Sequence, residues 1–83
     1  MAEQWYVYIM RSIPTGRLYV GVSEDVDRRH GQHERGNVWS TKAYRPWKVV
    51  YVEGFATKRE ALQREHFLKS HVGWLEKKRL AGA

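Results

Sequence analysis

Two short runs of aromatic and β-branched residues, on either side of a turn that contains Pro and Gly, restrict the fold of this chain more than any other feature. Residues 5–10 and 17–22 have the composition of β-strands, and residues 13–16 have that of a tight turn. This pattern predicts a β-hairpin in which Tyr8 lies opposite Tyr19. Because successive side chains of a strand point to opposite faces, both phenols are then expected on one face of the sheet.

The rest of the chain is predicted to form helices and one further strand. A helix over residues 25–34, capped by Ser23 or Asp25, precedes a polar loop over residues 37–46. The later elements are a strand over residues 47–55, a helix from the capping box Thr57 to Glu60 as far as about Ser70, and a short helix over residues 74–80. The order ββαβαα predicts an α/β (α+β) fold in one domain, residues 1–83, with a three-stranded, mainly antiparallel sheet flanked by helices.

The charge balance favours a polyanionic partner. Fifteen Lys and Arg against nine Asp and Glu give a formal net charge of +6 and a pI near 9.9, which suits a nucleic-acid-binding domain but also a merely solubilising surface. The chain has no cysteine, which excludes disulfides and thiolate metal sites. Its longest apolar run, residues 5–10, is too short for a membrane span or a signal peptide, so a cytoplasmic protein is expected.

Polar side chains occupy the side of the first helix that should face the core. Val26 is the only aliphatic residue inside this helix. At about 100° per residue, Arg29 and His33 fall on the same side as Val26, and His30 is adjacent. Either these residues line a functional surface, or the helix is solvated and barely packs on the sheet.

The second long helix carries a carboxylate in its apolar stripe. Ala61, Leu62 and Leu68 form the stripe, and Glu65 falls inside it. Because burying an unpaired carboxylate costs several kcal/mol, Glu65 is expected either to bind a metal ion or to form an ion pair. The candidate ion-pair partners are Lys58, Arg64 and Lys69.

Phenols, a guanidinium, an imidazole and a carboxylate together suit metal-assisted hydrolysis of a phosphodiester. The Glu65 carboxylate can hold a divalent cation that polarises the phosphoryl oxygen, and Arg29 can neutralise charge on the phosphate. A phenol, or an imidazole beside it, can orient or deprotonate the attacking water. Tyrosines are also ordinary strand residues, so the pattern alone leaves both interpretations open.

The spacing of these residues resembles the signature of the GIY-YIG nuclease superfamily. Tyr6-Val7-Tyr8, then ten residues, then Tyr19-Val20-Gly21 is similar to the paired triplets of that family. Residues 25–33 look like its helix with an invariant Arg and a following His, and residues 59–69 look like the segment with its metal-binding Glu. The likeness extends over residues 5–80, and the short length resembles the small stand-alone bacterial members.

The resemblance implies a role for each matched residue. Tyr8 and Tyr19 would position and activate the water, Arg29 would bind the scissile phosphate, and His33 would support a phenol by a hydrogen bond. Glu65 would ligate a single Mg²⁺ or Mn²⁺ ion, and which phenol acts as the base stays open. Substrate contacts are expected from Gly21, where a Cβ would intrude on a close backbone approach, and from Arg28, Lys42 and Arg45. The implied substrate is nucleic acid, most directly DNA, with a protein partner or a homodimer as a source of specificity.

Two departures from the family pattern predict slow hydrolysis or dependence on a partner. Residues 39–42, Trp-Ser-Thr-Lys, hold no Tyr or His where many members carry one. No Asn follows Glu65, although many members have an Asn there that orders the site.

Three other interpretations compete with a nuclease. The scaffold could hold nucleic acid without cutting it, a zinc ion could bind His30 and His33, or exposed tryptophans could dock a protein. Of Trp39, Trp47 and Trp74, most are expected in the core, since large aromatic residues usually pack there.

Overall fold

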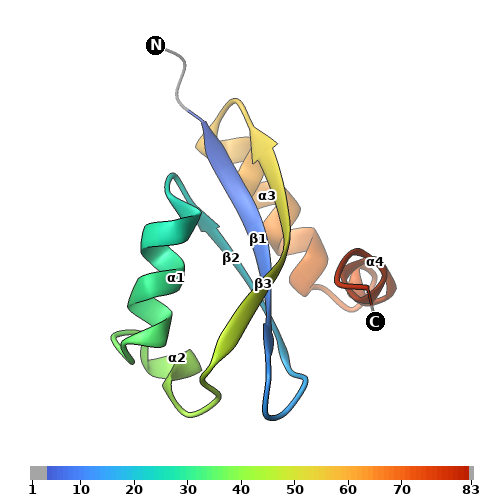
Figure 1. Cartoon of the computed structure of the whole chain (residues 1–83). Coiled ribbons are helices and arrows are strands. Elements are labelled where there is room, and N and C mark those ends of the chain that lie inside the picture. Colours follow the sequence, from blue (N-terminus) through green and yellow to red (C-terminus); the bar gives the residue numbers. More distant parts are fainter. Residues whose placement is uncertain (1–3, 83) are drawn as a thin grey trace.

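The computed structural model describes residues 4–82 as a three-stranded sheet with helices on both faces (Figure 1). Its elements are β1 (Trp5–Ser12), β2 (Leu18–Ser23), α1 (Val26–Glu34), α2 (Trp39–Lys42), β3 (Trp47–Phe55), α3 (Lys58–Lys69) and α4 (Trp74–Leu80). The α+β class is confirmed, and β3 has the predicted bounds. The short helix α2 was not predicted and interrupts the segment expected to be a polar loop. None of the helices in the described residues is long and apolar enough to cross a membrane.

The strands form an antiparallel sheet in the order β2-β1-β3, so that β1 is central. Tyr8 pairs with Gly21, two residues beyond the predicted partner Tyr19. That predicted pairing is wrong because β1 continues to Ser12, and the loop closes through a hydrogen bond from Ser12 N to Arg17 O at 2.8 Å. A shift of two residues leaves each side chain on its own face. Both phenols therefore do lie on one face of the sheet.

Each face of the sheet is covered by its own hydrophobic cluster. The first cluster lies under α3 and α4 and contains Val7, Ile9, Val20, Ala61, Leu68 and Ala81. The second lies under α1 and α2 and contains Tyr8, Met10 and Trp47. Alternate residues of β1 belong to different clusters, as the pleat of a strand requires. The central strand is therefore buried on both faces.

Side-chain caps fix where α1 and α3 begin. Asp25 Oδ1 accepts a hydrogen bond from Arg28 N at 3.0 Å, so Asp25 rather than Ser23 caps α1. Thr57 Oγ1 accepts from Glu60 N at 3.2 Å, as predicted. The Glu60 carboxylate accepts from the Thr57 hydroxyl at 3.0 Å. These caps set which side chains each helix directs at the sheet.

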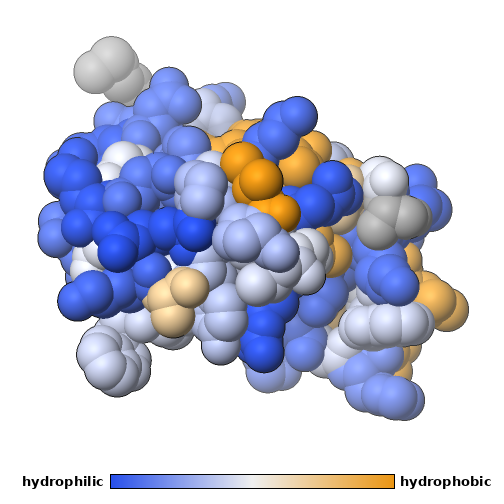
Figure 2. Space-filling view, turned by 60° about the horizontal axis from the view of Figure 1, so that its bottom comes forward, coloured by the Kyte–Doolittle hydropathy of each residue, from blue (hydrophilic) through white to orange (hydrophobic). Residues whose placement is uncertain are grey.

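Several apolar side chains predicted to lie in the core are exposed. Leu62 is 43% exposed, because it lies about 100° around α3 from the buried Ala61. Trp47 is in the core as expected, but Trp39 is 89% exposed and Trp74 is 48% exposed. The surface differs between the two sides of the molecule. Figure 2 shows mostly hydrophilic side chains over the side that carries α1 and α2, and a mixture of hydrophobic and hydrophilic ones toward α3 and α4.

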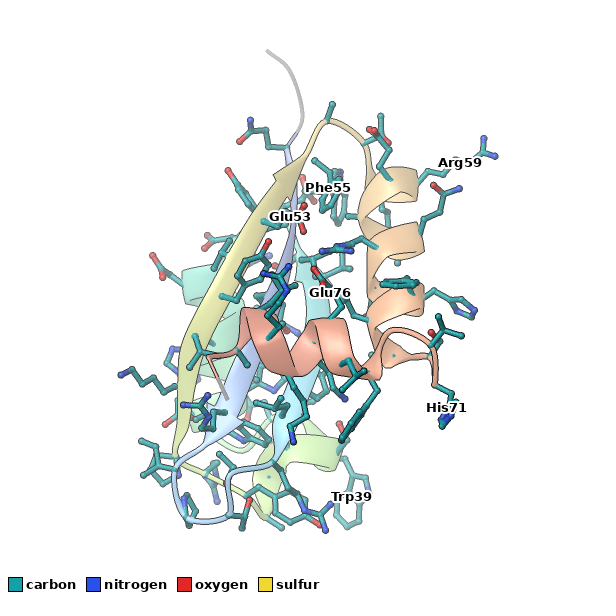
Figure 3. All side chains as sticks on the ribbon, turned by 90° about the vertical axis from the view of Figure 1, so that its right-hand side faces the viewer. Trp39, Glu53, Phe55, Arg59, His71 and Glu76 are labelled. Atoms are coloured by element: carbon teal, nitrogen blue, oxygen red, sulfur yellow. The ribbon has the colours of Figure 1, made fainter. Side chains whose placement is uncertain are left out.

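Arg64 attaches α4 to the rest of the molecule. Its guanidinium donates to Glu53 Oε1 of β3 at 3.1 Å and to Glu76 Oε1 of α4 at 3.4 Å. Figure 3 shows Glu53 and Glu76 near each other between β3 and α3. Arg64, a predicted ion-pair partner of Glu65, is therefore directed toward β3 and α4 instead. Lys58, another predicted partner, has its Nζ 5.1 Å from the ring of Trp5.

Candidate active site

Tyr8 of β1 and Tyr19 of β2 point to the face of the sheet that α1 covers. Their ring centroids are 6.3 Å apart, with an interplanar angle of 41°. The two phenols are diagonal neighbours, because Tyr8 pairs directly with Gly21. Tyr8 is buried and Tyr19 is half-buried. Tyr19 is therefore the more accessible of the two phenols.

Gly21 leaves the space that the Tyr8 ring occupies. A Cβ atom on Gly21 would lie 2.5 Å from both Cζ and Oη of Tyr8, far inside van der Waals contact. The atoms that a Cβ would meet are those of the Tyr8 ring. A contact between Gly21 and the substrate stays a prediction.

The helix α1 places an imidazole beside both phenols. His33 is fully buried. Its Nε2 lies 3.0 Å from Tyr8 Oη, and its ring centroid lies 5.0 Å from that of Tyr19. Its Nδ1 lies 2.7 Å from Oγ1 of Thr41, a residue of α2. The phenol that forms a hydrogen bond with His33 is therefore Tyr8.

The hydrogen positions in this chain of groups follow from the acceptors that are available. Thr41 Oγ1 donates to the Val38 carbonyl at 3.3 Å. If His33 Nδ1–H donates to Thr41 and Tyr8 Oη–H donates to His33 Nε2, every hydrogen in the chain has an acceptor. We therefore assign the His33 proton to Nδ1. The lone pairs of the Tyr8 oxygen are then acceptors, and the Arg29 side chain acts on Tyr8 as a hydrogen-bond donor.

Burial favours the neutral forms of both Tyr8 and His33. Burial, and then the neighbouring Tyr19, raises the pKa of Tyr8 to about 12, while Arg29 acts in the opposite direction. Burial, and then the charges of Arg29 and His30, lowers the pKa of His33 to about 4. At neutral pH the phenol is protonated and the imidazole is uncharged, which agrees with the assigned hydrogen positions.

Arg29 lies beside this buried pair. Its Nη1 donates to Gln32 Oε1 at 2.7 Å, and its charge acts on the pKa of both Tyr8 and His33. The Arg29 side chain is half-buried. Because a guanidinium has several N–H donors, Arg29 retains donors for an incoming anion.

The helix α3 brings a carboxylate and an ammonium group to the β2 edge of the sheet. The Glu65 side chain is 21% exposed, and Lys69 Nζ lies 3.2 Å from its Oε2. Lys69 Nζ also lies 5.6 Å from the centroid of the Tyr19 ring, and the charge of Glu65 contributes to the raised pKa of Tyr8. Of the three predicted ion-pair partners, Lys69 forms the pair.

Glu65 fits a hard divalent cation that keeps most of its water. Within residues 4–82, no group of three or more His, Asp or Glu side chains is arranged to hold a metal ion. Mg²⁺ is usually bound by one or two carboxylates together with water and substrate phosphate oxygens. A single carboxylate in the same cluster as the half-buried Arg29, which retains N–H donors, suits that coordination. Lys69 is 50% exposed, so it has solvent to move into when a cation approaches Glu65.

His30 and His33 do not point to a common position. His30 Nε2 lies 2.7 Å from the carbonyl oxygen of Trp47. Both ring nitrogens of His33 form hydrogen bonds, one with Tyr8 and one with Thr41. A zinc site built on these two histidines therefore does not fit the geometry.

The three other basic residues expected to bind substrate lie around α1 and α2. Arg28 is exposed on α1, and Lys42 is exposed on α2. Arg45 is exposed as well, and its guanidinium donates to Lys42 O at 2.8 Å and to Glu34 O at 3.2 Å. Arg45 thus links the ends of the two helices. Direct contact of these residues with a substrate stays a prediction.

Thr41, and the contact of Lys69 with Tyr19, belong to the cluster although no sequence signal marks them. Thr41 lies in the segment predicted as a loop, where no periodicity marks a buried residue. Lys69 has an i, i+4 spacing from Glu65, which predicts the ion pair but not the approach of Lys69 to Tyr19. Thr41 and the approach of Lys69 to Tyr19 are therefore identified only from the structure.

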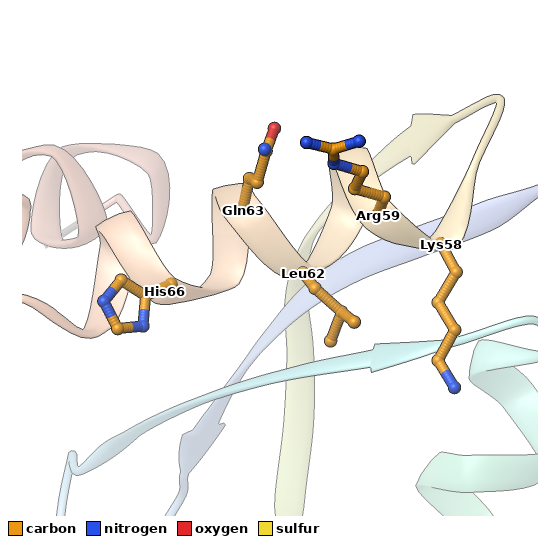
Figure 4. A pocket seen from close by; sticks show the side chains of 5 residues that line it. All are labelled: Lys58, Arg59, Leu62, Gln63 and His66. Atoms are coloured by element: carbon orange, nitrogen blue, oxygen red, sulfur yellow. The ribbon is translucent and has the colours of Figure 1, made fainter.

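A surface depression of about 640 Å³ lies apart from this cluster, on α3. Its lining residues are Lys58, Arg59, Leu62, Gln63 and His66, all from the one helix (Figure 4). A depression lined by one helix has no opposite wall to enclose a ligand. We therefore treat the tyrosine cluster, and not this depression, as the candidate active site.

Comparisons with known proteins identify the family of this chain. Residues 4–79 match the family model described as the GIY-YIG catalytic domain. A UPF0213 protein of Staphylococcus aureus (strain Mu3) is 42% identical over 71 residues, which are 84% of this chain and 85% of that protein. A UPF0213 protein of Staphylococcus saprophyticus is 39% identical over 69 residues, 82% and 83% of the two chains. The solution NMR structure of the UPF0213 protein BH0048 from Bacillus halodurans has a TM-score of 0.57 and 32% identity, and the match covers 95% of this chain and 83% of that chain. The chain therefore belongs to the GIY-YIG family, a family typical of endonucleases that bind nucleic acid and generally use a divalent metal ion.

Proposed function

We propose that this chain is a metal-dependent endonuclease that hydrolyses phosphodiester bonds of DNA, or of structured nucleic acid, with one divalent cation. The observation that carries the proposal is the hydrogen bond between Tyr8 Oη and His33 Nε2 at 3.0 Å, close to the charges of Arg29 and Glu65. These four side chains supply a proton acceptor, an anion-binding group and a cation ligand in one place. Those are the groups that phosphodiester hydrolysis requires.

Arg29 binds the scissile phosphate in this proposal. Its fork of N–H donors matches the oxygens of a phosphate. The charge of Arg29 lowers the pKa of His33, and a bound phosphate offsets that charge. Substrate binding therefore makes His33 a stronger base, which couples the proton acceptor to the presence of the substrate.

The Tyr8–His33 pair takes the proton of the attacking water. The water oxygen forms a bond to phosphorus, and the bond from phosphorus to the leaving oxygen breaks. The proton of the water passes to Tyr8 Oη while the proton of Tyr8 moves to His33 Nε2. Because the pKa of Tyr8 is about 12, this relay is easier than forming a free phenolate first. Tyr19, the more accessible phenol, orients the water.

Glu65 holds the cation. When bound, Mg²⁺ or Mn²⁺ stabilises the negative charge that develops on the phosphate and on the leaving oxygen. Before the cation binds, Lys69 neutralises the Glu65 carboxylate at 3.2 Å. Its approach to the Tyr19 ring leaves Lys69 near the phosphate position after the ion pair opens.

The test is a cleavage assay on supercoiled plasmid and on duplex, branched and single-stranded oligonucleotides of DNA and RNA, with Mg²⁺, Mn²⁺ or EDTA. Wild type is compared with Arg29→Ala and Glu65→Gln. We expect metal-dependent cutting that falls by about 100-fold or more in both variants, the usual effect of removing a group that stabilises the transition state. Arg59→Ala removes an exposed arginine from α3 and is the matched control, which should cut at the wild-type rate.

Cutting at the wild-type rate in Arg29→Ala would contradict the assignment of the site. Binding of nucleic acid that weakens with salt, without cutting in either metal, would instead favour a nucleic-acid-binding module on the GIY-YIG scaffold. We expect the activity in the cytoplasm. Since one site cuts one strand at a time, a double-strand cut would require a homodimer or a second encounter with the substrate.

A further inference from the structure

Trp39 is a large aromatic side chain held in solvent. It is 89% exposed and is the first residue of α2. Figure 3 shows its indole extending away from α2. An isolated exposed leucine would need no explanation, but a Trp forgoes an unusually large burial when it remains in water.

The helix α2 holds Trp39 outward because its opposite side is fixed to the candidate active site. Thr41 is fully buried and lies 2.7 Å from His33 Nδ1. The Thr41 carbonyl accepts a hydrogen bond from Trp47 Nε1 at 2.9 Å. Trp39 precedes Thr41 by two residues, about 200° around a helix, so anchoring Thr41 inward directs Trp39 outward. The indole is thereby mounted on the same short helix that contacts the Tyr8–His33 pair.

The segment around Trp39 is positively charged. Residues 35–48 contain four basic residues and no Asp or Glu. Those four, Arg35, Lys42, Arg45 and Lys48, are all exposed. Figure 2 shows that the surface over α1 and α2 is hydrophilic. An aromatic ring among cations is complementary to a polyanion that carries flat rings, which is the chemistry of nucleic acid.

A second set of exposed apolar residues lies in and just before α4, on the other side of the sheet. Val72 is 80% exposed and Leu75 is 71% exposed. Trp74, which lies between them in the sequence, is 48% exposed. Lys78 Nζ lies 4.7 Å from the Trp74 ring, but α4 covers the face of the sheet opposite the Tyr8–His33 pair. The two exposed tryptophans therefore provide a matched comparison within one molecule.

We infer that Trp39 stacks on an unpaired base of the substrate, so that the preferred substrate has a single-stranded segment next to the bond that is cut. This inference rests on the proposed nuclease function and specifies its substrate class. In duplex DNA both faces of each base are already stacked, so the indole has no free base face to contact. The basic residues of the segment 35–48 contact the phosphates of the same strand.

The experiment measures binding in EDTA, where no cutting is expected. The full chain is titrated into a single-stranded DNA oligonucleotide that contains 2-aminopurine and, separately, into a fluorescein-labelled duplex of the same sequence. Wild type is compared with Trp39→Ala, Trp39→Phe and Trp74→Ala. Trp39→Ala is expected to weaken single-strand binding by about 5- to 150-fold, the range for loss of one stacked base. Duplex affinity should stay within about twofold, because phosphate contacts remain.

Trp39→Phe is expected to retain a large part of the single-strand affinity and of the 2-aminopurine quenching, and Trp74→Ala is expected to alter neither. Equal losses for single strand and duplex in Trp39→Ala, or no loss for either, would overturn the inference. Because Trp39 is 89% exposed, its variants should unfold at the wild-type temperature, which is checked in parallel. The assay does not depend on cutting, so failure of the nuclease proposal and failure of base stacking give separate results.

Discussion

Replacing Gly21 by alanine is expected to displace the Tyr8 phenol and to damage stability and activity together. The new Cβ would lie 2.5 Å from Cζ and Oη of Tyr8 and 2.9 Å from Cε1, about 1 Å closer than an ordinary van der Waals contact. Gly21 does not have a positive φ angle, so the expected effect is steric and not a matter of backbone strain. Tyr8 is 1% exposed, and its ring has little space in which to move aside.

The magnitude follows from these contacts. Overpacking a well-packed interior costs about 1–3 kcal/mol, and weakening the hydrogen bond from Tyr8 to His33 adds about 1 kcal/mol. For a domain of this size, a total loss of about 2–4 kcal/mol lowers the Tm by roughly 8–30 °C. Urea and thermal denaturation of Gly21→Ala measure the loss of stability. Under the proposed mechanism, the cleavage rate should fall as well, because the displaced phenol no longer reaches His33.

Gly54 provides the matched control for Gly21→Ala. It lies in β3 opposite Tyr6, as Gly21 lies opposite Tyr8, but its Cβ would lie 3.4 Å from Tyr6 Cε1. Gly54→Ala is therefore expected to stay within about 0.5 kcal/mol of wild type or to stabilise slightly.

A double-mutant cycle isolates the contact between Gly21 and Tyr8. Tyr8→Leu removes the ring atoms that clash, so Gly21→Ala should cost much less in that background than in wild type. The steric reasoning is refuted if Gly21→Ala costs the same in both backgrounds, or no more than Gly54→Ala.

Three further predictions concern the polar groups of the site. Because folding lowers the pKa of His33 from 6.5 to about 4, the unfolded state binds more protons in this range, and stability should fall by up to about 3 kcal/mol as the pH drops from 6.5 to 4. Urea titrations across that range should show a shallower pH dependence in His33→Gln, and an identical slope would count against the shift. Thr41→Val keeps the shape but removes the acceptor of His33 Nδ1, and a loss of about 1–3 kcal/mol in urea denaturation is expected; a neutral result would contradict the assigned hydrogen positions. Lys69→Met removes the ammonium group that lies 3.2 Å from the Glu65 carboxylate, and it should raise the affinity for Mn²⁺ up to about fivefold in calorimetry. Unchanged affinity would mean that the ion pair does not compete with the cation.

The strands and the longer helices could be predicted because each carries a local signal. Asp25 and Thr57 mark the starts of α1 and α3, and both residues cap their helices in the structure. The run of residues 47–55 matches β3 at both ends. Helix α2 has only four residues and no side-chain cap, so it has neither the length nor the capping residue that makes a helix recognisable in sequence.

The register of the hairpin illustrates a limit of patterning. Alternation along a strand fixes which face a side chain is on, and it is unchanged by a shift of two residues. It therefore predicted Tyr8 and Tyr19 on one face but could not distinguish Tyr19 from Gly21 as the partner of Tyr8. The difference matters chemically, because the observed register places the phenol over a glycine and leaves the two tyrosines on a diagonal.

The same limit explains which parts of the candidate site were visible in the sequence. His33 and Glu65 stand out because a periodic apolar stripe has one expected kind of residue at each position, and a polar residue there is conspicuous. The groups that compensate for their burial are not conspicuous, because any polar side chain within reach can serve. Three cations of α3 were candidates for Glu65, and Lys69 forms the pair at an i, i+4 spacing, while the packing of α3 holds Arg64 on Glu53 and Glu76. Likewise only the position of α2 brings Thr41 to His33. Residues whose burial is unfavourable can thus be found from the sequence pattern. The partners that make their burial tolerable depend on how the helices pack. For this reason the residues of a functional site can be recognised from sequence before their supporting contacts can.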